Sequence, residues 1–110
     1  MFVGILFACS NSPKTDGVNY FAKAGLVTPK FSNEKLNEHL KSFEGLFNQM
    51  GTASTAKDKQ KSDELSIEYS DWILTSLKFK DSISREDLQQ LDKYLNSTTD
   101  PWNKLKANLF

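Results

Sequence analysis

The spacing of apolar residues predicts a long helix over residues 33–50. Apolar side chains recur there at steps of four, three, four and three, which places them on one face of a helix. They are Leu36, Leu40, Phe43, Phe47 and Met50. Ser32, just before the run, is a good N-cap residue, and Gly51, just after it, is a common stop signal.

A second long helix is predicted over residues 63–79. Its broader apolar face is formed by Leu65, Tyr69, Trp72, Ile73 and Leu77. Ile67 and Leu74 lie on a second face, nearly opposite the first. A helix that is apolar on two sides usually packs between neighbours, so we expect this helix to be the centre of a bundle.

The C-terminal part of the chain predicts two more helices. Ser84 is a suitable N-cap for a helix over 85–95, which the polar residues 96–99 should end. Asp100-Pro101 then has the order of an N-cap followed by a first-turn proline. This order predicts a short last helix over 101–108.

The remaining segments set the fold class. A short apolar patch predicts a helix over 18–24, closed by Gly25. Residues 51–62 contain only two alanines as apolar residues, which predicts a polar loop, or a loop that gives way to an early polar helical turn. No segment alternates as a half-buried strand does. The predicted fold is therefore all-α, a small bundle of three main helices (33–50, 63–79, 85–95) with shorter helices near 18–24 and 101–108.

The N-terminus has a different character from the rest. Residues 1–8 are apolar apart from one glycine, and Cys9 and a polar, turn-forming stretch to Gly17 follow. The apolar run is far shorter than the ~20 residues that span a bilayer. A run of ~7–15 apolar residues ending at a small residue is typical of a secretory signal.

Leu6-Phe7-Ala8-Cys9 resembles the lipobox of bacterial lipoproteins. In that family the cysteine is lipidated and becomes the mature N-terminus, followed by a flexible polar tether. The resemblance implies a lipid on Cys9, a removed segment 1–8, a tether over 9–17 and a single helical domain over 18–110. It also implies a bacterial envelope location, membrane-anchored, periplasmic or on the surface.

An alternative interpretation of the same residues stays open. Residues 2–7 also have the composition of a strand or helix end packed in the core, with Cys9 as a small buried residue. That interpretation predicts a cytosolic helical domain that binds other proteins.

Composition narrows the chemistry. The chain has 110 residues, with 14 Lys and Arg against 14 Asp and Glu, and this balance argues against a nucleic-acid binder. A single cysteine excludes an intrachain disulfide and a Cys-based zinc site. The only histidine, His39, borders the apolar face of the 33–50 helix, where a half-packed structural role is typical. We therefore expect no cofactor and no metal.

Glu64, Glu68 and Asp71 form a stripe between the two apolar faces of the 63–79 helix. Carboxylates four residues apart repel each other slightly on a surface, so a basic partner or nearby lysines would stabilise them. The stripe is the best candidate for an interaction or cation surface, and otherwise is a solvated face.

These observations favour a non-catalytic protein. We expect a small exported or lipid-anchored bacterial envelope protein whose helical domain binds another macromolecule, in an adaptor, exclusion or immunity-type role. Its partner should be a protein, contacted through a helix face or the 51–62 loop. An enzyme that uses the carboxylate stripe or His39 is the third interpretation.

Overall fold

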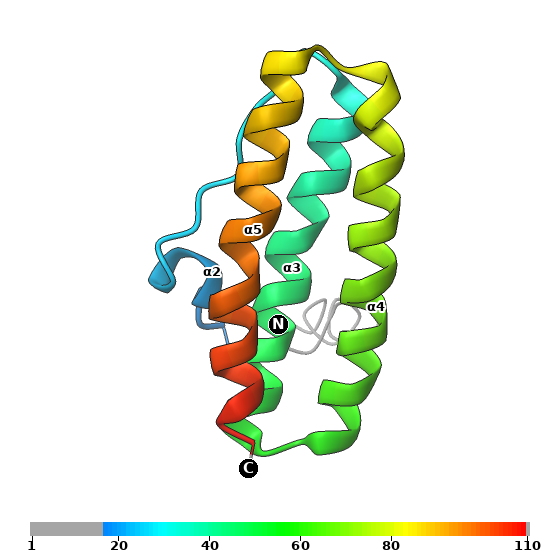
Figure 1. The fold of residues 1–110 in the computed structure, drawn as a ribbon. Helices are drawn as coiled ribbons and strands as arrows, with labels where there is room; N and C mark the ends of the chain where they lie inside the picture. The colour runs from blue at the N-terminus through cyan, green and yellow to red at the C-terminus, as the bar shows by residue number, and fades with distance from the viewer. Residues whose placement is uncertain (1–16, 110) are drawn as a thin grey trace, which may run out of the picture.

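The computed structural model describes residues 17–109, and all regular elements in that range are helical. The all-α fold class is thus confirmed, with three long helices (Figure 1). In chain order the elements are α2 (Tyr20–Lys23), α3 (Glu34–Ala56), α4 (Lys59–Leu77), the 3₁₀ helix η1 (Lys78–Ser82) and α5 (Arg85–Ala107). Cys9, the lipobox-like segment and the tether as far as residue 16 lie outside the described residues.

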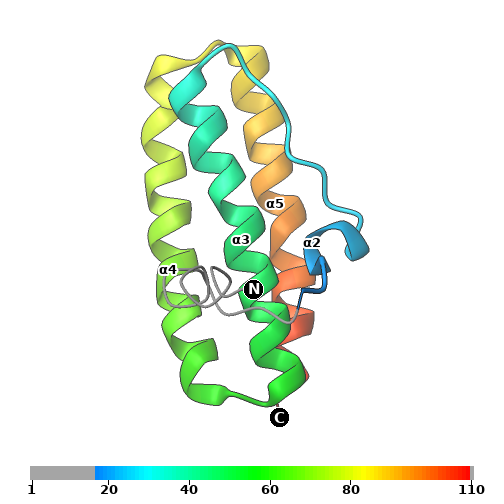
Figure 2. The same ribbon diagram turned by 180° about the vertical axis from the view of Figure 1, so that it is seen from behind.

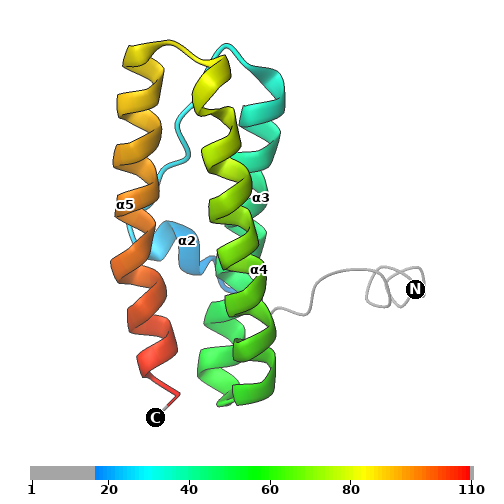
Figure 3. The same cartoon turned by 45° about the vertical axis from the view of Figure 1, so that its right-hand side comes forward.

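The three long helices run antiparallel to their sequence neighbours and form a bundle, in which α3 packs against α2, α4 and α5 (Figures 1 and 3). The helix α2 packs against α3 on the side away from α4 (Figures 1 and 2). The prediction that the 63–79 helix is the centre of the bundle is therefore wrong, because α3 holds that place. Ile67 and Leu74, the second apolar face of α4, are exposed, and no helix of residues 17–109 covers them.

An aromatic cluster around Phe43 of α3 explains why α3 is central. The Phe43 ring lies 4.6 Å from Trp72 and 5.5 Å from Tyr69, between ring centroids, so it joins α3 to α4. The same ring lies 6.0 Å from Trp102 of α5 and 6.1 Å from Phe21 of α2. One side chain thus contacts α2, α4 and α5, and each contact adds about 0.5–1.5 kcal/mol beyond the burial of apolar area.

The helix α3 is longer than its apolar pattern predicts. It begins after Asn33, whose Oδ1 accepts a hydrogen bond from the Leu36 amide, so Asn33 and not Ser32 is the N-cap. At the other end the helix continues through Gly51 to Ala56. Gly51 is no stop signal, because it lies under the ring of Tyr20, where only a residue without a side chain leaves room.

The predicted loop over 51–62 is mostly helical. Small residues hidden from a hydrophobicity pattern are buried there, among them Ala53, Ser54 and Ser62. The turn between α3 and α4 consists of Lys57, in the left-handed conformation with φ 59°, and Asp58, the N-cap of α4. Because Asp58 starts the next helix at once, α4 begins four residues before its predicted start.

The predicted break at residues 96–99 is also absent, and α5 is one continuous helix from Arg85 to Ala107. Ser84 caps it as predicted, accepting a hydrogen bond from the Asp87 amide at 3.1 Å. Thr98 is fully buried, and its hydroxyl donates to the Leu95 carbonyl at 2.8 Å. The hydroxyl is thereby satisfied inside the helix, and Pro101 lies in the helix interior, not at a new N-terminus.

The predicted helix over 18–24 is present but shorter, as α2 over Tyr20–Lys23. Asn19 caps α2 by accepting from the Ala22 amide at 3.1 Å, and Gly25 has a φ of +76°. Such a positive φ is what a helix-ending glycine supplies. Across residues 17–109, no helix is both long enough and apolar enough to cross a bilayer.

Candidate binding surfaces

The outer face of α4 carries exposed apolar side chains. Ile67 is 66% exposed, Leu74 is 59% exposed and Leu77 is 38% exposed. Leu74 is seven residues after Ile67 and three before Leu77, so the three side chains form a strip along one side of the helix. Single exposed apolar residues are normal on any protein, whereas several large apolar side chains on one side of a helix make that side a candidate contact surface.

The predicted carboxylate stripe borders this strip. Glu64, Glu68 and Asp71 are all exposed. Glu64 and Asp71 stand three residues before and four residues after Ile67, which are the positions of nearest neighbours on a helix surface. We refer to Ile67, Leu74 and Leu77 together with Glu64, Glu68 and Asp71 as the α4 surface.

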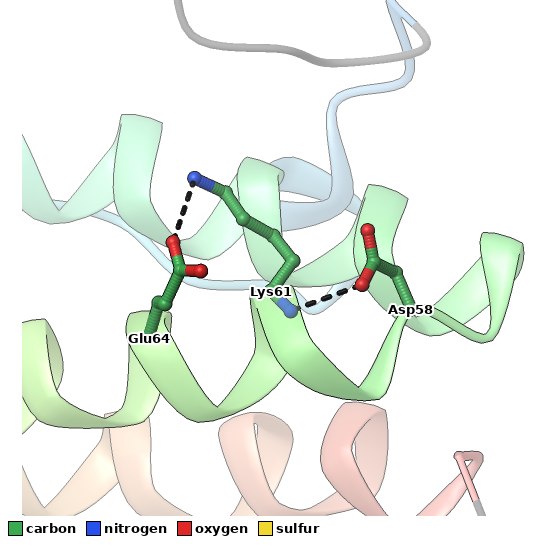
Figure 4. Close-up of polar contacts among 3 residues, drawn as sticks. All are labelled: Asp58, Lys61 and Glu64. Carbon is green, nitrogen blue, oxygen red and sulfur yellow. Dashed lines mark hydrogen bonds and ion pairs between the residues drawn. The ribbon is translucent and has the colours of Figure 1, made fainter.

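The first turns of α4 contain a helix cap and an ion pair. Asp58 Oδ1 accepts a hydrogen bond from the Lys61 amide at 3.0 Å, which caps the helix (Figure 4). The Lys61 ammonium lies 3.9 Å from Glu64 Oε1 (Figure 4). Both side chains of this pair are substantially exposed, so the pair contributes little to stability. A nearby lysine, as predicted, thus lies beside one of the three carboxylates, Glu64.

A groove between α4 and α5 continues the α4 surface. Its volume is about 530 Å³. Tyr69, Ile73 and Leu77 line its α4 side, and polar side chains of α5, including Asn96 and Thr99, line the other. Leu77 belongs to both the groove and the exposed strip. The apolar surface of α4 therefore runs from the core, along the groove, to the solvent.

His39 lies apart from the α4 surface and is held by structural contacts. Its Nε2–H donates to Ser76 Oγ at 2.8 Å and to the Trp72 carbonyl at 3.1 Å. In return the Trp72 indole N–H donates to the His39 carbonyl at 2.8 Å, and the two rings stack with centroids 5.3 Å apart. Burial lowers the pKa of His39, and the bond to the Trp72 carbonyl offsets only part of that shift.

This geometry makes His39 a neutral imidazole that joins α3 to α4. The structure therefore places the two predicted candidates, His39 and the carboxylate stripe, in different environments and does not bring them together. Among residues 17–109, no three His, Cys, Asp or Glu side chains gather closely enough to hold a metal ion. Cys9, the predicted lipidation site, lies outside this range.

The sequence pattern identifies the apolar residues of the α4 surface but does not show that they are exposed. The second apolar face, Ile67 and Leu74, was visible as a heptad-spaced pair. It predicts a buried face only if a neighbouring helix exists on that side, and the described chain supplies none. Comparisons of the chain with protein-family models, with curated proteins and with solved structures gave no match.

Proposed function

We propose that this protein is a non-catalytic binding protein of the bacterial cell envelope. A lipid on Cys9 holds it at the membrane, and the α4 surface binds a basic amphipathic helix of another protein. The binding role rests on one observation, the exposure of Ile67 and Leu74 beside carboxylates. Burying these two side chains against a partner would contribute about 1.5–3 kcal/mol each when fully removed from water.

The chemistry of the α4 surface specifies the partner. An apolar strip favours a helix that presents apolar residues at helical spacing. The carboxylates of Glu64, Glu68 and Asp71 favour lysine or arginine beside that apolar stripe, because opposite charges steer the encounter and fix the register. A basic amphipathic helix satisfies both requirements, whereas an acidic one would be repelled.

The non-catalytic role is supported by the state of the candidate reactive groups. His39 uses its Nε2–H for contacts within the fold, and its lowered pKa keeps the ring neutral. The carboxylates of the α4 surface are exposed, whereas a catalytic acid or base is usually held in a cleft. Binding accounts for these residues better than acid–base chemistry does.

The anchor is supported by the resemblance of Leu6-Phe7-Ala8-Cys9 to a lipobox and by the polar residues that follow it. Metabolic labelling with a palmitate analogue tests it in bacteria that express the full chain from its native start. We expect wild type to be labelled and Cys9→Ala to be unlabelled. Unlabelled wild type would refute the anchor and favour a cytosolic binding domain.

The binding role is tested with a designed peptide, since its chemistry is specified. The probe is a fluorescent amphipathic helix with a leucine stripe flanked by lysines, and its anisotropy reports binding to the full chain. Replacing Ile67 and Leu74 together by serine should weaken binding about tenfold or more, as expected for interface anchors. Val27→Ser is the matched control, because Val27 is apolar and 79% exposed but lies outside α4.

A second peptide separates charge from apolar contact. In it the flanking lysines are replaced by glutamates with the leucine stripe kept. Binding should be lost, and the triple variant Glu64→Gln, Glu68→Gln, Asp71→Asn should reduce the salt dependence of the lysine peptide's binding. Equal binding of both peptides, or equal binding by wild type and the serine variant, would refute the role of the α4 surface.

A further inference from the structure

A second pocket lies on the opposite side of the bundle, where α2, α3 and α5 meet. Its volume is about 400 Å³, within the ~300–1,000 Å³ usual for small-molecule sites. The pocket is independent of the α4 surface, because none of its lining residues belongs to α4. Its apolar walls are formed by Tyr20 of α2, Phe47 of α3, and Pro101 and Leu105 of α5.

The walls are held in place by the fold. The Tyr20 ring packs on Gly51, and its hydroxyl lies 2.9 Å from Thr55 Oγ1. Phe47 is buried in the aromatic core, 6.1 Å from Phe21 between centroids. Pro101 has little conformational freedom of its own. A pocket with such walls exists before its ligand arrives, so binding requires little reordering.

The charged residues of the pocket are both cations. They are Lys23, in the last turn of α2, and Lys104, in the last turn of α5, and no carboxylate of residues 17–109 lines the pocket. Within residues 17–109, neither lysine pairs with a carboxylate. Lys104 also complements the negative end of the α5 dipole, but Lys23 stands on a helix too short for that role to matter.

We propose that this pocket binds a small apolar carboxylate. The hydrocarbon part lies against Phe47 and Leu105, and the carboxylate lies between Lys23 and Lys104. Apolar walls remove the hydrocarbon from water, and two unpaired ammonium groups select an anion over a neutral or cationic head group. The ligand is taken as a free, monomeric acid and not as the head group of a lipid in a membrane.

Octanoate is the probe, with octanol and octylamine as matched neutral and cationic compounds. Amide shifts of the ¹⁵N-labelled full chain are followed by NMR, at neutral pH and below the micelle concentration of each compound. Octanoate should give saturable shifts in α2, in the middle of α3 and at the end of α5. Octanol should bind about tenfold more weakly, and octylamine more weakly still.

Variants assign the effect to the pocket. Lys23→Gln and Lys104→Gln should each weaken octanoate binding about three- to tenfold and leave octanol binding unchanged. Lys93→Gln is the control, because Lys93 is an exposed lysine of α5 that does not line this pocket. Ala24→Phe should fill the pocket and weaken both compounds, with an unchanged urea midpoint showing that the fold is intact.

Three results would overturn the proposal. The first is an absence of saturable shifts at the pocket with octanoate. The second is equal binding of octanoate and octanol, which would make the lysines merely solvated. The third is that the unlipidated Cys9→Ala chain sediments with phosphatidylglycerol vesicles, that this binding depends on Lys23 and Lys104, and that octanoate does not compete with it. Such a result would identify a lipid surface as the occupant.

Discussion

The ring of Tyr20 lies directly on Gly51, so that a Cβ added to Gly51 would overlap the ring carbons. This contact fastens α2 to α3 and allows α3 to pass through a glycine without ending. The hydrogen bond of Phe21 N to Asn48 Oδ1, at 2.9 Å, joins the same two helices one turn earlier on α3. Gly51 therefore leaves room for the Tyr20 ring and does not end the helix.

Gly51→Ala should destabilise the protein, although alanine is the better helix former. The added methyl group displaces the Tyr20 ring, and overpacking of this kind costs about 1–3 kcal/mol. Urea unfolding followed by circular dichroism measures the change. Gly45→Ala is the matched control, since Gly45 is also inside α3 but a Cβ there meets nothing within 4 Å. The control should raise stability by about 0.5–1 kcal/mol, and a stabilising Gly51→Ala would contradict the contact.

Thr98 and Tyr69 should be energetically coupled. The Tyr69 hydroxyl lies 2.8 Å from Thr98 Oγ1, and Thr98 donates its own hydrogen to the Leu95 carbonyl. Tyr69 is therefore the donor in the pair. Thr98→Val should cost about 1–2 kcal/mol of unfolding free energy, because it leaves that donor without its acceptor. A double-mutant cycle with Tyr69→Phe measures the coupling, and strictly additive effects would refute it.

Pro101→Ala should stabilise the protein. A proline inside a helix has no N–H to donate, so the Ser97 carbonyl loses its partner four residues ahead. Alanine restores that donor. Alanine also leaves the unfolded chain more conformational freedom than proline does, which reduces the gain in stability by about 0.4–1 kcal/mol. We expect a net gain of about 1–2 kcal/mol in urea unfolding. Asn103→Ala is the control, because Asn103 is exposed in the same helix, and it should change the unfolding free energy by at most about 0.5 kcal/mol. Equal changes for Asn103→Ala and Pro101→Ala would contradict the role of the missing donor.

His39 should make stability depend on pH below its ordinary pKa. Burial lowers the pKa of His39 in the folded state, so the unfolded state binds the proton more readily. Stability is then greatest above ~6.5, the ordinary pKa of histidine, and falls as the pH decreases below it. The difference in unfolding free energy between wild type and His39→Gln should narrow from pH 8 to pH 5. A difference that stays constant or widens over this range would contradict the assignment.

The start signal of α5 and the main apolar face of α3 follow from the sequence for a local reason. A cap is a contact between residues three positions apart, as in the bond from the Asp87 amide to Ser84. An apolar face is a periodicity of 3.6 within one segment, and the Leu36 to Met50 series is buried as that periodicity predicts. Both features are fixed before any other helix is present.

Helix ends and the partner of each face depend on distant residues, and only the tertiary structure decides them. Gly51 and Thr98 have the character of helix breakers in isolation, but Tyr20 covers the first and Tyr69 satisfies the second. Both faces of α4 carry apolar residues in the sequence, yet the Trp72 face is buried and Ile67 is exposed. The spacing of apolar residues indicates which faces of a helix can be buried. The number and position of the neighbouring helices determine which of these faces is buried.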